Sequence, residues 1–431
     1  MCYAIPGKLV EIEDSIGVVD YYGEKRRALI NFANVQIGDY VYAQGGIIIR
    51  KISEREALEV LDAWKEMFFE LKQRDSDLAK VRTTKVSNNV LNLFEKINKN
   101  KALSRNEQIS LLKSKDPREL QLLYECANSI RQREHGNACC IHGIIEFSNY
   151  CALDCFYCGI RREKNIERYR MSIEEIIESA KYAVDALGFK AILLQSGEDY
   201  WYDNEILISV VQELRKLDIL LFLSLGERDI SLYSKLYEAG ARAVLLRFET
   251  SNNAIYEKLK PAKKLKNRLT LIKDLKRIGF VLATGFLIGL PDETDEDIIN
   301  NIELTKSLKP DMYSFGPFVN AKGTPLYNHP MVNKDMMLKI VALSRIMDRN
   351  SNILVTTAFE TLDINARREG LLAGANSLMI NITPKKYKNL YSIYENRAGI
   401  SMEPSDDIEK TLLLLKELGR APIDLGVLFK G

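Results

Sequence analysis

The chain has 431 residues, of which 46% are hydrophobic and 28% charged, and its 61 Lys and Arg nearly balance its 59 Asp and Glu. That balance argues against nucleic acid or an anionic membrane as a partner, and no apolar run approaches the roughly 18 residues that cross a bilayer. The N-terminus is charged where a secretory signal would be apolar, and three of the seven cysteines share one loop. We therefore predict a cytoplasmic protein with metal chemistry rather than a disulfide framework.

The first segment alternates apolar and polar residues in short stretches, which predicts a small all-β, OB-like barrel. The stretches are 7–14, 17–23, 27–33, 39–45 and 46–52. Ser53, with Glu56 three residues later, forms a capping-box pattern that predicts the start of a helix. Polar, aperiodic residues follow. We divide the chain into a small barrel with its C-terminal helix (1–75), a linker (76–88) and a larger domain (89–431).

Beyond a helical extension that ends near residue 134, eight apolar runs alternate with helical stretches. The runs are 144–148, 191–195, 219–224, 243–248, 281–287, 311–316, 353–357 and 376–380. Eight strand–helix units in series predict an α/β fold, a (β/α)8 TIM-type barrel with buried parallel strands. The alternative is an open doubly wound sheet, and the count of eight favours the closed barrel.

Three cysteines follow the first predicted barrel strand, at the strand end where chemistry gathers in such barrels. Cys151, Cys155 and Cys158 form a CxxxCxxC pattern. Three thiolates can hold three irons of a 4Fe-4S cluster and leave the fourth iron open. A zinc site is the alternative, but it would normally use a fourth Cys or His. The other thiols, Cys126, Cys139 and Cys140, have no such spacing, and we predict that they are packed or incidental.

The sequence also contains a basic run at 260–268, "KPAKKLKNR". A run of this kind is typical of a solvated helix start, and we predict that its side chains face water rather than a polyanionic ligand.

CxxxCxxC after the first strand of an eightfold barrel resembles the radical S-adenosylmethionine (SAM) superfamily. The resemblance implies that SAM binds the open iron and that one electron cleaves it to methionine and a 5′-deoxyadenosyl radical. Tyr157 stands where the family packs an aromatic side chain near adenine. The family's GGE-like motif, which binds the methionyl amine, is represented here in modified form by Gln195, Ser196, Gly197 and Glu198.

The resemblance extends to the FeFe-hydrogenase maturase HydE, through the strand-end segments "IIEFSNYCALDCFYCGIRR", "LLQSGED" and "LLRFETSN". Biotin synthase and methylornithine synthase are nearer relatives than the rest of the superfamily. The resemblance implies that Glu249 and Arg268 hold the amino-acid end of SAM. It also implies an inner cavity for a cysteine-like substrate, lined by Arg247, Met312, Thr356, Thr357 and Tyr391. A buried arginine needs an anionic partner, so a purely structural Arg247–Glu249 pair is the alternative. Residues 400–420 contain no cysteine, and we predict a single cluster.

The segment from "MCYAIPGKLVEIED" to "ALEVLDAW" resembles HypC, the small chaperone of NiFe-hydrogenase maturation. The resemblance implies that Cys2 binds iron carrying cyanide and carbon monoxide, together with a HypD-like partner, and a terminal thiolate is a suitable soft ligand. The family usually has a histidine where Gln44 stands, so iron binding could differ here. An incidental Cys2 is the alternative.

Taken together, these features predict a radical SAM enzyme of hydrogenase maturation. Its barrel would make or modify an iron-bound small ligand, such as carbon monoxide, for a NiFe hydrogenase, while the N-terminal domain carries or presents iron. Predicted partners are HypD-like proteins or the hydrogenase large subunit, and an electron donor such as ferredoxin or flavodoxin. The alternatives are maturation of FeFe hydrogenase, a methylornithine- or biotin-synthase-like enzyme acting on an amino acid, and a non-enzymatic scaffold.

Overall fold

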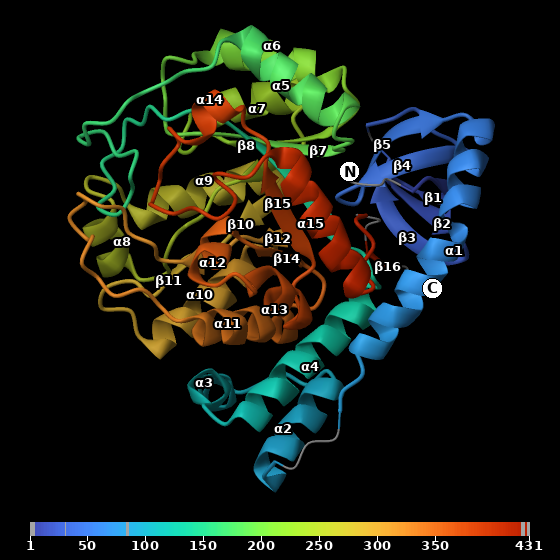
Figure 1. Ribbon diagram of the computed structural model, residues 1–431, viewed down its shortest axis with the longest axis horizontal. Coiled ribbons are helices and arrows are strands. Elements are labelled where there is room, and N and C mark those ends of the chain that lie inside the picture. The colour runs from blue at the N-terminus through green and yellow to red at the C-terminus, as the bar shows by residue number, and fades with distance from the viewer. Residues whose placement is uncertain (1–4, 31, 83–85, 424–426, 429–431) are drawn as a thin grey trace.

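The structure is a computed structural model that describes residues 5–30, 32–82, 86–423 and 427–428. Cys2, the predicted iron ligand, lies outside the described residues. The chain forms a small β-barrel near its N-terminus, a helical extension and a large strand–helix barrel, which lie side by side in Figure 1.

The small barrel contains the five predicted strands. They are β1 (Gly7–Glu13), β2 (Ile16–Tyr21), β3 (Glu24–Leu29), β4 (Tyr40–Gln44) and β5 (Ile47–Ile52). Antiparallel neighbours run β3-β2-β1-β4-β5, and a parallel pairing of Leu29 with Ile47 joins the two ends. Gly45 and Gly46 both adopt positive φ, at 61° and 71°, which lets β4 turn directly into β5. The predicted small all-β barrel is confirmed.

Helix α1 (Glu54–Leu78) leaves this barrel and runs along the molecule to the helical extension. The Ser53 hydroxyl accepts the Glu56 N–H at 3.2 Å, as the capping pattern predicts, whereas the Glu56 carboxylate pairs with Arg50 at 3.2 Å. The helix continues three residues into the predicted linker. The extension then consists of α2 (Asn88–Asn98), α3 (Arg105–Lys113) and α4 (Pro117–His135).

Eight parallel strands close into the large barrel in the order β10-β12-β14-β15-β6-β7-β8-β9. They are β6 (Cys140–Ser148), β7 (Ala191–Ser196), β8 (Leu220–Ser224), β9 (Ala243–Leu245), β10 (Val281–Thr284), β12 (Met312–Tyr313), β14 (Asn352–Val355) and β15 (Ser377–Asn381). Two further short strands, β11 (Leu287–Ile288) and β13 (Gly316–Pro317), pair beside it. The closed α/β barrel is confirmed over the open sheet.

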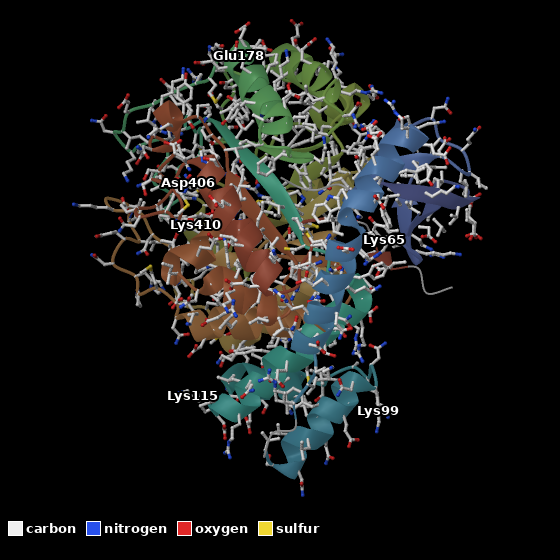
Figure 2. All side chains as sticks on the ribbon, turned by 45° about the vertical axis from the view of Figure 1, so that its right-hand side comes forward. Lys65, Lys99, Lys115, Glu178, Asp406 and Lys410 are labelled. Atoms are coloured by element: carbon white, nitrogen blue, oxygen red, sulfur yellow. The ribbon has the colours of Figure 1, made fainter. Side chains whose placement is uncertain are left out.

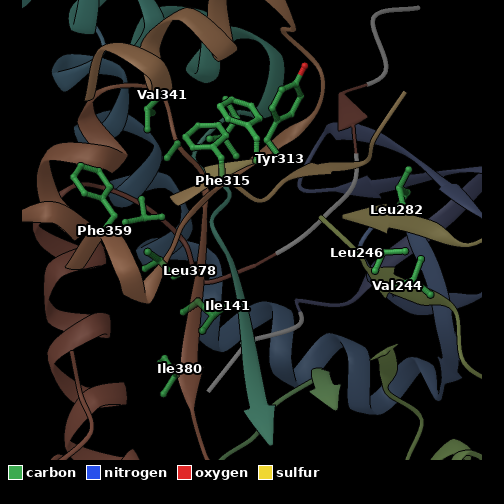
Figure 3. Close-up of a cluster of buried hydrophobic side chains, with 14 of the residues drawn as sticks. Ile141, Val244, Leu246, Leu282, Tyr313, Phe315, Val341, Phe359, Leu378 and Ile380 are labelled. Carbon is green, nitrogen blue, oxygen red and sulfur yellow. The ribbon is translucent and has the colours of Figure 1, made fainter. Parts of the chain in front are cut away.

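Helices surround the barrel, as Figure 1 shows. They are α5 (Ile173–Asp185), α6 (Asn204–Arg215), α7 (Ile230–Ala239), α8 (Asn253–Leu259), α9 (Leu265–Ile278), α10 (Asp295–Ser307), α11 (Lys334–Met347), α12 (Thr357–Leu362), α13 (Ala366–Leu372), α14 (Lys385–Lys388) and α15 (Pro404–Glu417). Strand side chains such as Ile141, Leu378 and Ile380 form part of the buried apolar layer, with Val341 and Phe359 on helices (Figure 3). Burial of each such side chain stabilises the fold by about 1.5–3 kcal/mol.

The small barrel packs against the N-terminal ends of the large barrel's strands. Ile47 belongs to the same buried apolar cluster as Ala191, Leu220 and Ala243, which are the first residues of β7, β8 and β9. The Arg242 guanidinium, just before β9, lies 4.1 Å from the centroid of the Phe32 ring. The hairpin that carries Gln44 therefore faces this end of the large barrel.

Two further contacts join the domains. Asp75 near the end of α1 is 1% exposed, and its carboxylate lies 2.7 Å from Arg131 and 2.8 Å from Arg420. The last described strand, β16 (Val427–Leu428), adds to the small barrel by pairing antiparallel with β3. Residues from both ends of the chain thus form one sheet.

Charged side chains are distributed over the outer surface, as the balanced composition suggests. Figure 2 labels Lys65, Lys99, Lys115, Glu178, Asp406 and Lys410, all of them exposed. None of the helices in the described part of the chain combines the length and apolar character that a membrane span requires.

Candidate active site at the carboxyl ends of the barrel strands

A cavity of about 280 Å³ opens at the carboxyl ends of the barrel strands. Almost all of the residues predicted to bind the cofactor or the substrate line it. These are Cys151, Cys155, Tyr157, Cys158, Gln195, Ser196, Gly197, Glu198, Arg247, Glu249, Arg268, Thr356, Thr357 and Tyr391. Met312 does not: it is 2% exposed inside the barrel, where the Ser377 hydroxyl lies 3.8 Å from its sulfur.

The cysteine loop between β6 and α5 is held in place by a side chain of its own, that of Arg168. The Arg168 guanidinium donates to the carbonyls of Asn149, Ile160, Arg161 and Lys164 at 2.6–3.0 Å. One arginine therefore fastens both ends of the loop. Gly159 lies so close to the 391–394 segment that a Cβ would be 2.0 Å from the Ser392 carbonyl oxygen.

Two of the three thiols are made less acidic by their surroundings. Burial raises the pKa of Cys151, and burial together with the neighbouring Cys155 raises the pKa of Cys158 to about 12. Both thiols are thus protonated at neutral pH in the absence of a metal. A metal that binds here displaces those protons, since cysteine binds metals as the thiolate.

The modified GGE-like segment spans the end of β7 and lies against the cysteine loop. A Cβ on Gly197 would lie 2.2 Å from the Tyr150 carbonyl oxygen, so only glycine permits this approach. The next residue, Glu198, donates its N–H to the Cys151 sulfur at 3.4 Å. Its carboxylate is 5% exposed and accepts the Glu227 N–H at 2.9 Å through one oxygen.

Glu249 follows β9 and has a strained backbone conformation, with φ at 69°. One of its carboxylate oxygens is 3.4 Å from Arg247, and the other is 3.7 Å from Lys260. Arg268 is 3% exposed and pairs with Glu227 at 2.8 Å and Glu198 at 3.8 Å. Predicted site residues thus pair with opposite charges, both with one another and with Lys260 and Glu227.

The prediction that the basic run at 260–268 faces water is wrong at both ends of the run. Lys260 and Arg268, at its two ends, are 6% and 3% exposed and line the cavity, whereas Lys264 between them is solvated. Lys260 was not identified as a site residue, because a cluster of lysines at a helix start is typical of a surface.

Another part of the wall was also missed by sequence reasoning. Glu146 is fully buried on the inner face of β6, and Arg397 donates to both of its oxygens. Asn381 of β15 donates to the same carboxylate at 2.8 Å. A charged residue inside the apolar run 144–148 was the available signal for Glu146, while Arg397, in an irregular segment, carried none. Burial, followed by the charge of Glu146, raises the pKa of Tyr391 well above its usual value.

The remaining predicted thiols and the Gln44 side chain are buried elsewhere. Cys126, Cys139 and Cys140 are 0–2% exposed, as expected of packed thiols. Gln44 is 1% exposed, and neither atom of its side-chain amide has a hydrogen-bond partner among the described residues.

The residues present fit a cluster with a SAM-like ligand. Three thiols border one cavity, as a 4Fe-4S cluster with an open iron requires. Glu198 and Glu249 each keep one buried oxygen that accepts no hydrogen bond from the described residues, which suits a cationic group such as the amine of SAM. Within the described ranges, no set of three His, Cys, Asp or Glu side chains is arranged around a metal-ion site.

Sequence comparisons agree with this arrangement. Residues 145–305 match the radical SAM superfamily, residues 1–64 match the HupF/HypC family, and residues 314–420 match the Biotin and Thiamin Synthesis associated domain. The [FeFe] hydrogenase maturase subunit HydE of Thermotoga maritima is 39% identical over 303 residues, which cover 70% of this chain and 87% of HydE. The 3-methylornithine synthase of Methanosarcina acetivorans is 30% identical, over 73% of this chain and 94% of its own.

Solved structures share the barrel. Methylornithine synthase (PylB) superposes with a TM-score of 0.68 at 27% identity and covers 77% of this chain and 97% of its own. The maturase HydG, at 20% identity and a TM-score of 0.66, shows the fold alone and covers 83% of this chain and 78% of its own. The chain therefore belongs to the radical SAM superfamily of enzymes, as a relative of HydE, and carries an N-terminal domain of the HupF/HypC family.

Proposed function

We propose that this enzyme acts in the maturation of a hydrogenase metallocofactor. The barrel makes or modifies an iron-bound small ligand, carbon monoxide or its precursor, for the Fe(CN)2CO centre of a NiFe hydrogenase, and the N-terminal domain carries or presents iron through Cys2. The observation that carries the proposal is the union, in one chain, of a cavity bordered by three cysteines with a HupF/HypC-family domain.

In this proposal, Cys151, Cys155 and Cys158 hold the 4Fe-4S cluster. The cluster and SAM, when bound, supply a 5′-deoxyadenosyl radical by one-electron cleavage. Glu198, Glu249 and Arg268 border the cavity, and their charges orient the amino-acid end of SAM. Tyr157 packs beside the adenine of SAM. The remaining polar wall binds a small substrate, and it includes Arg247, Thr356, Thr357 and Tyr391.

The placement of the small barrel bears on how iron would move. The cavity opens at the carboxyl ends of the barrel strands, whereas the Gln44 hairpin packs at their N-terminal ends. We therefore assign the hand-over of iron to a partner, a HypD-like protein or the hydrogenase large subunit, and the electron to a ferredoxin or flavodoxin. The proposal requires a reducing compartment, the cytoplasm, because the cluster and its free thiols are sensitive to oxidation.

A second candidate is a radical enzyme that acts on a free amino acid. The similarity to a 3-methylornithine synthase over nearly all of that enzyme's length favours it, as does the paired charge of Arg247 and Glu249 in the cavity. A third candidate is maturation of an FeFe hydrogenase, the role that the name of HydE states. It would use the same cavity, but the product would go to a different hydrogenase.

Anaerobic reconstitution with iron, sulfide and a reductant tests these functions. We expect the full chain to cleave SAM and release 5′-deoxyadenosine, and Cys155→Ala to lose both cluster and cleavage. Cysteine, tyrosine, ornithine-like amino acids and an iron–cyanide–carbonyl complex are then compared for stimulation of cleavage. Stimulation by a free amino acid alone would select the second candidate.

Cys2→Ala separates the two domains. We expect this variant to cleave SAM normally but to fail to restore the infrared bands of the iron–cyanide–carbonyl centre in a strain that lacks the wild-type protein. Normal bands in the strain without any copy of the chain would contradict a role in NiFe maturation. A non-enzymatic scaffold would be indicated if the loaded chain released no 5′-deoxyadenosine.

A further inference from the structure

Lys260 is a buried cation that the proposed function leaves without a role. It is the first residue after helix α8, is 6% exposed, and lies beside the cysteine loop. Its Nζ is 3.7 Å from the Cys155 sulfur and 3.7 Å from a carboxylate oxygen of Glu249. The ammonium therefore contacts one of the three sulfurs assigned to the cluster.

Backbone contacts fix Lys260 relative to that sulfur. The Lys260 N–H donates to the Tyr256 carbonyl at 3.0 Å, and the Phe156 N–H, next to Cys155, donates to the Leu259 carbonyl at 3.0 Å. The backbone at Leu259 and Lys260 is thus tied to both α8 and the cysteine loop. The Lys260 side chain is buried, and its ammonium lies against Cys155 rather than in solvent.

Lys260 shares its carboxylate partner near Cys155 with a second cation. Glu249 is the carboxylate paired with Lys260, but the same carboxylate is also 3.4 Å from Arg247. One negative group is thus shared by two cations, so Glu249 compensates the charge of Lys260 only in part. A charge in a buried site acts more strongly than the same charge in water.

We propose that Lys260 sets the reduction potential of the cluster by donating a charged hydrogen bond to the Cys155 sulfur. Hydrogen bonds to cluster sulfurs and the local net charge both determine such potentials. A cation at Cys155 stabilises the reduced, more negative cluster, so it makes acceptance of one electron from the donor protein easier. The inference rests on the three-cysteine cluster of the proposed function.

The test is a redox titration of the anaerobically reconstituted full chain, followed by the electron paramagnetic resonance signal of the reduced cluster. We expect Lys260→Met to lower the equilibrium constant for reduction at least tenfold, which is about 59 mV for one electron. Lys260→Arg keeps the charge and should restore most of the wild-type potential. Lys264→Met, which removes a solvated lysine paired with Glu257, should leave the potential unchanged.

The outcomes separate the possible roles of Lys260. Equal potentials for wild type and Lys260→Met, with equal iron and sulfide contents, would overturn the proposal and leave Lys260 as a structural pin. An unchanged potential with at least tenfold weaker SAM binding would assign Lys260 to the SAM carboxylate instead. If Lys260→Met does not load, Lys260→Gln replaces it, and a potential equal to that of Lys260→Arg overturns the proposal. A wild-type chain that binds no cluster would refute the three-cysteine site itself.

Discussion

At Gly197, directly after β7, the backbone approaches the cysteine loop closely. An added Cβ would lie 2.2 Å from the Tyr150 carbonyl oxygen and 2.7 Å from the Cys151 Cβ, and neither atom can move without shifting the loop. We expect Gly197→Ala to lower iron and sulfide content severalfold after reconstitution. Lys410→Ala, on the exposed face of α15, is the control. Equal loading of both variants would show that the loop tolerates the shift.

Single residues could be predicted where their spacing alone carries chemistry. Cys151, Cys155 and Cys158 are recognisable because three thiols on one loop have few structural uses. Lys260 was misjudged because its burial depends on a contact between Phe156 and Leu259, residues about a hundred positions apart. The pairing of Glu146 with Arg397 likewise joins distant segments, and no local pattern reports it.

At the scale of elements, Glu293 shapes the turn between β11 and α10. Its carboxylate accepts the Gly289 N–H at 2.7 Å and a weaker bond from Asn301 at 3.3 Å. Burial raises the pKa of Glu293 to about 7. The folded chain therefore binds this proton more tightly than the unfolded chain, and the resulting stability is lost as the pH rises through about 7.

Glu293→Gln removes this titration while keeping an acceptor for the Gly289 N–H. We expect the melting temperature of the wild type to fall between about pH 6 and about pH 8, and the variant to fall less over the same range. Differential scanning calorimetry at both pH values measures the difference. Glu238→Gln on the exposed face of α7 serves as the control and should follow the wild type. A parallel decline in all three proteins would contradict the assignment.

The barrel strands were predictable because strands buried on both faces are almost uniformly apolar. The residues at which these strands begin and end were less predictable. β6 begins at Cys140, four residues before the predicted run, because Cys140 pairs with Ser377 of β15. β9, β10 and β12 are shorter than their apolar runs. Just beyond β10 the backbones come close, since a Cβ on Gly285 would be 2.4 Å from the Ser314 carbonyl oxygen.

At the scale of the whole molecule, Asp75 is the anion at the joint between α1 and the large barrel. Its replacement by asparagine would leave Arg131 and Arg420 buried without their carboxylate, and breaking such a pair costs about 3–5 kcal/mol. We expect Asp75→Asn to lower the free energy of unfolding by this amount in urea titrations. Glu66→Gln, on the exposed face of the same helix, should change it little. A small effect of Asp75→Asn would mean that the domains are held mainly by apolar contacts.

The joint itself could not be predicted. The polar, aperiodic residues 76–88 predicted a linker between the domains. In the structure the end of α1 is already tied to the large barrel, since Arg74 donates to the Lys416 carbonyl at 3.0 Å, 342 positions away. The packing of Ile47 against the starts of β7 and β8 could not be predicted from the local sequence either. An isoleucine in a β-hairpin can be buried in the core of its own domain or against another domain. Composition and motifs identified both domains; long-range contacts alone determine how they meet.

Because β16 pairs with β3, the small barrel contains strands that are synthesised at very different times. The ribosome releases the five strands of the small barrel first, yet the partner of β3 at residues 427–428 emerges some 375 positions later, on the order of tens of seconds at ordinary rates of translation. Until then, the outer edge of β3 has backbone groups open to other chains. The N-terminal domain is therefore completed only after the barrel has been translated, and a truncated product would leave that edge exposed to chaperones and proteases.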